Sequence, residues 1–308
     1  MQLRTALQQG LELLRAGGVG APELTAEVLL CHALRRERVY IFSHPEHELT
    51  ELEWLHYGRY LHERLQGKPT QYITRVQEFW GREFRVEPGV LIPRPETEHV
   101  VEQALAVLET SAPAQSRERQ RAVKSANRYR SLTVAAPIGN VAAPLRILDI
   151  GTGSGILAIT LALETGLGTF ATDISSKALT IARGNASRLG ADCFFSECDL
   201  GAAFADSSFD LIVSNPPYIE SREIGTLQRE VRDWEPREAL DGGASGLEIY
   251  ARLIPEARRL LRPKGTLVLE IGAGQGKLVP ALFDARWSAP KVVNDLAGLA
   301  RVVVAHRV

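Results

Sequence analysis

The fold of this chain is decided by the stretch Leu148-Asp149-Ile150-Gly151-Thr152-Gly153-Ser154-Gly155. The apolar residues 145–150 that lead into it predict a buried strand, and the apolar residues 156–163 that follow it predict a helix. Glycines in the turn between them allow positive φ angles and let the backbone approach a ligand closely. This order of strand, glycine-rich turn and helix is typical of a ligand-binding α/β sheet.

The spacing of the glycines separates two kinds of cofactor site. Dinucleotide-binding proteins use G-x-G-x-x-G, which would require glycine at Ile156, whereas this chain has G-x-G-x-G. No acid or base for hydride transfer is evident either. The glycine spacing therefore argues against a dinucleotide site, and an NAD-binding oxidoreductase is disfavoured.

Acidic residues follow the next two predicted strands. Residues 169–173 end in Asp173, about 20 residues after the turn, where a carboxylate can accept both hydroxyls of a ribose. Residues 194–200 form a third predicted strand, in which Asp199 could accept the exocyclic amine of an adenine. Because ligands bind at the carboxyl ends of strands in an open α/β sheet, we expect these acids beside the glycine-rich turn.

A fourth predicted strand, residues 209–214, runs into Asn215-Pro216-Pro217-Tyr218. Each proline restricts the residue before it to extended conformations and offers no N–H. The corner presents the side-chain oxygen of Asn215 and the carbonyl of Pro216, which together can accept both hydrogens of a planar –NH2 group, with Tyr218 against its face. A proline-rich strand exit without function is the alternative for an isolated tetrapeptide, but its position at the ligand edge favours chemistry.

Further motifs carry a family resemblance. They are Gln71-Tyr72-Ile73, Glu78-Phe79-Trp80-Gly81, residues 91–98 (Leu-Ile-Pro-Arg-Pro-Glu-Thr-Glu), residues 235–243 (Glu-Pro-Arg-Glu-Ala-Leu-Asp-Gly-Gly), Gly246-Leu247 and residues 294–303. With the two central motifs, they make the chain resemble the HemK/PrmC family of protein-(glutamine-N5) methyltransferases, which modify the Gly-Gly-Gln loop of peptide chain release factors. The resemblance covers the chain except residues around 110–144.

The resemblance implies a class I methyltransferase: a Rossmann-like, seven-stranded α/β sheet whose last strand is antiparallel, S-adenosyl-L-methionine as cofactor, and class 1 release factors as protein substrates in translation termination. We expect a monomer. The residues it assigns to catalysis are Asn215, Pro216 and Tyr218, with Pro217 added for substrate binding. Those it assigns to the cofactor are Gly151, Thr152, Gly153, Ser154, Gly155, Asp173, Asp199, Leu200 and Asn215. Two positions depart from the family: Arg75 replaces a frequent glycine in a turn between domains, and Leu200 replaces an aromatic residue seen against the adenine in some members.

Two alternatives of other classes remain. An adenine-N6 nucleic-acid methyltransferase shares the Asn-Pro-Pro-Tyr corner, but it should carry a basic DNA-reading domain, and the net charge of this chain is −1. We therefore expect no direct DNA binding. A non-catalytic scaffold is disfavoured by the intact glycines, Asp173 and Asn215.

Composition sets the remaining bounds. Cys31, Cys193 and Cys198 form no disulfide or metal-binding pattern, so we expect buried thiols, no metal and a reducing compartment. The N-terminus lacks the apolar core of a signal peptide, and no apolar run approaches membrane-spanning length. These features predict a cytoplasmic protein without a membrane partner.

The periodicities predict three parts: a helical domain over residues 1–70, a β-hairpin linker over 71–93, and an α/β domain over 94–308 with an insertion at about 110–144. The resemblance implies that the first part is a substrate-recognition domain and the last part the methyltransferase domain; a helical cap that only covers the catalytic domain is the alternative for the first part. Thr97 and Glu98 could line the pocket or cap the next helix. Towards the C-terminus we expect a helix over 248–261 that stops at residues 262–265, a strand over 265–271, another helix that includes residues 278–283, and closing strands at 292–293 and 301–304. The polar residues between Tyr218 and Gly246 predict a long loop that folds over the substrate.

Overall fold

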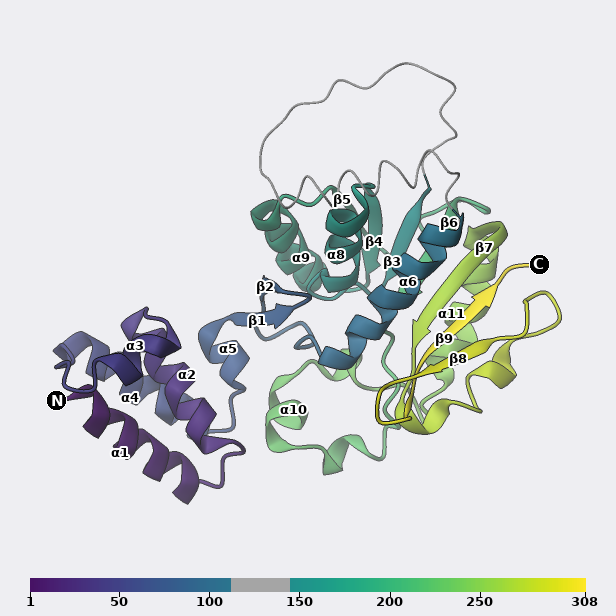
Figure 1. The fold of residues 1–308 in the computed structure, drawn as a ribbon. Coiled ribbons are helices and arrows are strands. Elements are labelled where there is room, and N and C mark those ends of the chain that lie inside the picture. Colours follow the sequence, from purple (N-terminus) through teal and green to yellow (C-terminus); the bar gives the residue numbers. More distant parts are fainter. Residues whose placement is uncertain (112–144) are drawn as a thin grey trace, which may run out of the picture. The chain divides into compact units, whose positions relative to one another are not determined.

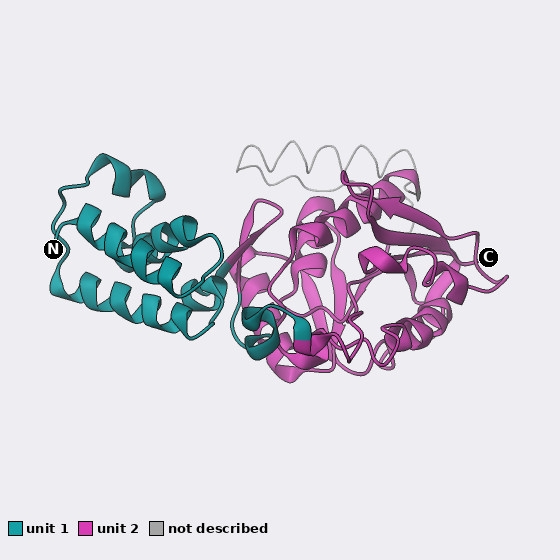
Figure 2. Cartoon of the chain, turned by 90° about the horizontal axis from the view of Figure 1, so that it is seen from below, with its two compact units in different colours: residues 1–76, 86–88, 226–235 teal, residues 77–85, 89–225, 236–308 magenta. Residues whose placement is uncertain are grey.

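The computed structural model describes residues 1–111 and 145–308 (Figure 1). The predicted insertion at about 110–144 lies almost wholly outside the described residues. The chain forms two compact units, which Figure 2 distinguishes by colour. Unit 1 contains residues 1–76, 86–88 and 226–235, and unit 2 contains residues 77–85, 89–225 and 236–308. Both units are therefore discontinuous in sequence.

Unit 1 is helical, as predicted. Its helices are α1 (Leu3–Ala16), α2 (Pro22–Leu34), α3 (Arg38–Ser43), α4 (Glu51–Leu65), α5 (Thr70–Thr74) and α10 (Arg229–Trp234). Leu3 and Leu14 of α1 pack with Leu29 of α2 and Tyr57 of α4 in one apolar cluster. The chain turns between Ala16 and Pro22 and between Ser43 and Glu51, and these turns let the short helices pack against one another.

The segment after the Asn-Pro-Pro-Tyr corner is more ordered than the predicted loop. It contains the 3₁₀ turn Ile224–Thr226, helix α10 and the 3₁₀ turn Arg237–Ala239. Within unit 1, Glu230 of α10 forms an ion pair with Arg64, and Lys68 lies 5.9 Å from the ring centre of Trp234. These tertiary contacts stabilise a helix too short to persist alone.

The predicted hairpin is confirmed as β1 (Val76–Phe79) and β2 (Arg82–Arg85). Trp80 and Gly81 form its two-residue turn with φ angles of 53° and 65°, a conformation that matches the twist of paired strands. Tyr72, which the prediction assigned to the hairpin linker over 71–93, lies instead in α5. Arg75 ends α5 with a φ of 62°, which explains why glycine suits this position in the family.

Unit 2 contains a seven-stranded sheet of order β5-β4-β3-β6-β7-β9-β8. The strands are β3 (Ile147–Ile150), β4 (Thr169–Asp173), β5 (Cys193–Glu197), β6 (Phe209–Ser214), β7 (Leu261–Glu270), β8 (Lys291–Asn294) and β9 (Ala300–His306). The pairs among β3 to β7 are parallel, and β9 is antiparallel to both β7 and β8. The predicted α/β sheet with an antiparallel last strand is confirmed.

Helices cover both faces of this sheet. The helices are α6 (Glu98–Ser111), α8 (Ile156–Thr165), α9 (Ser176–Leu189) and α11 (Glu248–Leu260). Because successive strand residues point to opposite faces, Ile147 joins a core with α6, α8 and α9, whereas Leu148 and Ile150 join a core with α11 (Figure 1). The sheet is thus buried on both sides, which explains its nearly continuous apolar strands.

Three local predictions are wrong. Strand β5 ends at Glu197 and not at residue 200. The strand predicted over 265–271 begins earlier, at Leu261, so residues 262–265 end the helix as predicted but lie within β7; the register against β6 shifts between Phe209 and Leu211 and so absorbs the extra residues. Helix within residues 278–283 is limited to the 3₁₀ turn Pro280–Leu282, after which the chain extends and Phe283 packs edge-on against Trp287.

The register places the ends of four parallel strands together. Ile150 lies opposite Thr172 and Ser214, and Ser214 lies opposite Leu269. The residues that come next on each strand therefore share one edge of the sheet; they are Gly151, Asp173, Asn215 and Glu270.

In the described residues, no helix has the length and apolar character needed to cross a bilayer. The same part of the chain contains no cluster of three or more His, Cys, Asp or Glu side chains suited to a metal ion.

Candidate active site

The three glycines of the turn after β3 have different surroundings. Gly151, Gly153 and Gly155 have φ angles of 73°, 56° and 89°, where other residues are strained. A Cβ atom added at Gly151 or Gly153 would have no atom within 4 Å, whereas at Gly155 it would lie 2.7 Å from Cδ1 of Ile159 and 3.2 Å from Cβ of Ala182. The first two glycines border open space, and the third allows α8 and α9 to pack closely.

Asp149 holds the turn from inside the sheet. Its Oδ2 accepts hydrogen bonds from Thr152 Oγ1 (2.6 Å) and from the backbone N–H of Ala158 (3.1 Å). Its Oδ1 has no hydrogen-bond partner in the described residues, and burial raises the pKa of this carboxyl to about 7. The Thr152 side chain is thus committed to Asp149, and Ser154 is also buried, so a ligand could reach these two residues only through their backbone.

Asp173 braces the same turn from the end of β4. Its Oδ2 accepts from the backbone N–H of Gly153, and its Oδ1 accepts from that of Ser175, both at 2.9 Å. A carboxylate has about four lone-pair positions, so each oxygen keeps one for a further donor such as a ribose hydroxyl.

Asp199 and Leu200 lie beyond the end of β5 and not on the strand. Asp199 is exposed and forms an ion pair with Arg252 of α11. Leu200 has a φ of 50° and packs, partly buried, against the core on the α11 face. The described contacts do not bring Asp199 into the network that joins the turn to Asp173.

Asn215 is oriented by a residue that the sequence analysis left open. Its Nδ2 donates to Oγ1 of Thr97 at 3.1 Å, and Thr97 is fully buried in the 3₁₀ turn Pro95–Thr97. The Thr97 hydroxyl also bonds to Glu270, the last residue of β7. Thr97 is therefore part of the site, whereas Glu98 accepts the backbone N–H of Trp80 at 2.8 Å and holds the hairpin.

Gln275 and the segment 240–246 hold the residues that follow Pro217 in place. Gln275 Nε2 donates to the carbonyls of Tyr218 (3.2 Å) and Gly246 (3.0 Å). A Cβ at Gly242 would lie 2.7 Å from Cα of Tyr218, so this close approach requires glycine. Burial raises the pKa of the Tyr218 phenol to about 12, which keeps it a neutral aromatic surface.

Sequence reasoning did not identify Glu270 or Gln275. The signal available was positional: Glu270 ends a parallel strand at the ligand edge, as Asp173 does.

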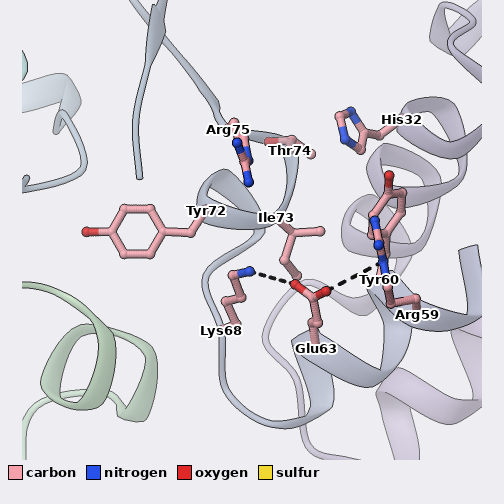
Figure 3. A pocket seen from close by; sticks show the side chains of 9 residues that line it. All are labelled: His32, Arg59, Tyr60, Glu63, Lys68, Tyr72, Ile73, Thr74 and Arg75. Atoms are coloured by element: carbon pink, nitrogen blue, oxygen red, sulfur yellow. Dashed lines mark hydrogen bonds and ion pairs between the residues drawn. The ribbon is translucent and has the colours of Figure 1, made fainter. Parts of the chain in front are cut away.

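A separate pocket of about 310 Å³ lies in unit 1 (Figure 3). Glu63 points into the group of lining side chains and bonds to Lys68 at 2.6 Å, with Arg59 at 3.7 Å. The other lining residues are His32, Tyr60, Tyr72, Ile73, Thr74 and Arg75. None of the predicted catalytic or cofactor-binding residues lines it.

Comparison with known proteins places the chain in a family. The family model "PrmC N-terminal domain" matches residues 5–74, and "Methyltransferase small domain" matches residues 139–231. A release factor glutamine methyltransferase of Koribacter versatilis is 41% identical, covering 100% of this chain and 99% of that protein. The proteins of the same name from Nitratidesulfovibrio vulgaris and Bacillus subtilis are 39% and 36% identical, covering 99% and 93% of this chain and 95% and 92% of their own lengths. The resemblance seen in the motifs is confirmed: the chain belongs to the release factor glutamine methyltransferase family.

Proposed function

We propose that this protein transfers a methyl group from S-adenosyl-L-methionine to the side-chain amide nitrogen (N5) of the glutamine in the Gly-Gly-Gln loop of class 1 peptide chain release factors, and so modulates translation termination. The observation that carries the proposal is the Asn215 corner beside the glycine-rich turn, at the edge where β3, β4, β6 and β7 end together. The full-length identity to proteins named for this activity supports the choice of substrate.

The residues at this edge fit S-adenosyl-L-methionine. Open space beside Gly151 and Gly153 leaves room for a ligand against the backbone, and Asp173 retains two acceptor positions for ribose hydroxyls. Asp199 and Leu200 are proposed to border the adenine, which requires Asp199 to share its carboxylate with Arg252. When bound, the cofactor supplies an electrophilic methyl group on a sulfonium.

The corner residues prepare the acceptor nitrogen. An amide nitrogen is a poor nucleophile because its lone pair is delocalised into its own carbonyl. Asn215 Oδ1 and the Pro216 carbonyl accept hydrogen bonds from the two N–H groups of the substrate amide, and Tyr218 packs on the planar amide. These contacts would hold the acceptor nitrogen in position for the methyl group that bound cofactor would supply, and this alignment together with the preorganised dipoles would provide the acceleration. The proton leaves after transfer, to water or a weak acceptor.

The remaining parts are assigned by the same proposal. Residues 1–70 form the domain that grips the release factor, 71–93 link it to the methyltransferase domain over 94–308, and the segment between Tyr218 and Gly246 covers the substrate peptide. The protein acts as a cytoplasmic monomer without direct DNA binding.

The test is intact-mass spectrometry of a purified release factor after incubation with this protein and S-adenosyl-L-methionine. We expect a gain of about one methyl mass that disappears when the loop glutamine is replaced by alanine. Methylation of adenine in an oligonucleotide, with no gain on the release factor, would transfer the assignment to the adenine-N6 class. No transfer to either acceptor would overturn the proposal.

A further inference from the structure

We propose that Glu270 is a positioning residue for this reaction: acting through Thr97, it holds the Asn215 carboxamide with its oxygen turned towards the substrate. The inference rests on the proposed function, because it concerns the same –NH2 acceptor site, and it adds two residues that the Asn-Pro-Pro-Tyr corner does not contain.

The three residues form a continuous chain of contacts inside unit 2. Glu270 is 2% exposed and Thr97 is 0% exposed, so water does not compete for their hydrogen bonds. The Thr97 hydroxyl bonds to the Glu270 carboxylate, and Thr97 Oγ1 lies 3.1 Å from Nδ2 of Asn215. Glu270 Oε2 has no hydrogen-bond partner in the described residues.

Hydrogen-bond polarity fixes the direction of the chain. An ionised carboxylate only accepts, so the single O–H of Thr97 must point to Glu270. Thr97 can then offer Asn215 only a lone pair, which must be met by an N–H of the carboxamide. Because the amide is planar, Oδ1 then faces away from Thr97, where it can accept a hydrogen from the substrate.

Loss of the charge on Glu270 removes this constraint. A neutral partner can donate to Thr97, which frees the Thr97 hydroxyl to donate to Oδ1 of a flipped Asn215. The flipped carboxamide presents its own –NH2 to the –NH2 of the substrate. Two donors then face each other and the nitrogen is no longer held.

The groups around Glu270 explain why burying its carboxylate is unfavourable and why its charge depends on pH. Burial is the main cause that raises the pKa of this carboxyl to about 7, and Glu96 raises it further, while the Thr97 hydrogen bond, Arg301 on β9 and Arg94 lower it. Tyr250 of α11 donates to the Glu270 backbone carbonyl at 2.9 Å, and, after burial, the charge of Glu270 contributes to the raised pKa of the Tyr218 phenol. A buried carboxyl with so few partners is unfavourable for stability, which is typical of a residue kept for function.

The test uses three variants of the full chain: Glu270→Gln, Thr97→Val and Thr97→Ser. Each is assayed with saturating cofactor on the –NH2 acceptor that the wild type methylates, whether release-factor glutamine or oligonucleotide adenine. We expect kcat to fall about 10-fold in Glu270→Gln and Thr97→Val, with KM values within about 3-fold, because the nucleophile is misoriented and not unbound. Thr97→Ser keeps the hydroxyl, so its kcat should stay within about 3-fold of the wild-type value.

Two further readouts separate positioning from a structural role. The wild-type kcat should fall as pH drops through about 7, and Glu270→Gln should lack this acid limb. The double variant Thr97→Val/Glu270→Gln should be no slower than Thr97→Val alone, because both act through one contact. Glu164→Gln, which removes the 2.7 Å ion pair between Glu164 of α8 and Arg82 of β2, is the matched control and should keep both kcat and the acid limb.

The outcomes distinguish this inference from the function itself. If the wild type does not methylate the release factor, the proposed function is overturned. The positioning role of Glu270 (the relay through Thr97 to Asn215) is then tested with the same variants on oligonucleotide adenine. Near-normal kcat in Glu270→Gln with the acid limb retained overturns the relay alone. If Glu270→Gln lowers the melting temperature above pH 7, Glu270 is structural and the relay is also overturned.

Discussion

The backbone N–H of Gly153 donates to Oδ2 of Asp173 at 2.9 Å, across 20 residues of sequence. The glycine-rich turn after β3 and the acid after β4 are therefore one structure and not two separate motifs. Displacing either one should disturb the other.

Replacing Asp173 by alanine tests this connection. Both carboxylate bonds to the backbone are lost, together with the acceptors proposed for the ribose. Since a hydrogen bond to a charged group contributes roughly 1.5–3 kcal/mol, the Kd for S-adenosyl-L-methionine should rise about 10-fold or more. Isothermal titration calorimetry measures the change. Asp192→Ala, at an exposed acid before β5, is the control, and equal affinities in both variants would exclude Asp173 from the cofactor site.

Replacing Asn215 by alanine should affect chemistry more than cofactor binding. The variant loses one of the two acceptors that hold the substrate nitrogen, so kcat should fall by about 10²-fold or more. The cofactor Kd should stay within a few-fold. Single-turnover methylation of the release factor gives the rate, and Asn294→Ala on the exposed end of β8 serves as control. Near-normal turnover would remove the corner from the mechanism.

Much of the sheet could be predicted because its strands are short apolar runs with polar ends. The bounds of β4 and β6 agree with the sequence prediction, since Asp173 and Asn215-Pro216 interrupt each run. The start of β7 could not be predicted in this way. Pro263-Lys264-Gly265 has the residues of a turn, and only pairing with β6 absorbs them as an irregularity.

The candidate site also has a part that the sequence predicts and a part that it does not. The glycine spacing and the Asn-Pro-Pro-Tyr corner are local patterns, so their position at one edge follows from strand order. The hydrogen bond between Thr97 and Asn215 joins residues 118 positions apart and depends on how the turn before α6 packs against β6 and β7. No local pattern distinguishes it from a helix cap.

Two alanine substitutions should separate the roles of neighbouring glycines. Gly153→Ala places a methyl group in open space, so the protein should fold, with a strain of about 1–2 kcal/mol, while the methyl occupies room proposed for the cofactor. Gly155→Ala forces a contact of 2.7 Å with Ile159 and should mainly lower the melting temperature. Calorimetric titration and thermal unfolding of both variants provide the comparison. A larger loss of stability in Gly153→Ala would contradict the assignment.

Gln275→Ala should loosen the aromatic side of the site. The substitution leaves the carbonyls of Tyr218 and Gly246 and the N–H of Gly272 without this partner. Each unsatisfied buried group costs about 1–3 kcal/mol, so the melting temperature should fall. Because Tyr218 shifts as well, KM for the release factor should rise. Gln9→Ala on the exposed face of α1 is the matched control and should change neither quantity.

The two buried carboxyls predict how stability depends on pH. Burial raises the pKa of Asp149 and of Glu270 from their ordinary values of 3.8 and 4.5 to about 7. Between about pH 4 and 7 the folded state therefore retains protons that the unfolded state has released, and the folding free energy favours the folded state less as pH rises. Above about pH 7 both states are ionised at these positions, and this contribution becomes constant.

Urea unfolding at intervals from pH 5 to 8 measures this slope, and the double variant Asp149→Asn/Glu270→Gln should flatten it. Asp284 and Asp295 have a lowered pKa, so they are ionised in both states throughout this range and add no slope. Burial lowers the pKa of His32, which opposes the carboxyls near pH 6 but does so equally in both proteins. The difference between wild type and variant thus isolates the two acids. A wild type whose stability rises with pH more steeply than that of the variant would show that these carboxyls are ionised at little cost in the folded protein.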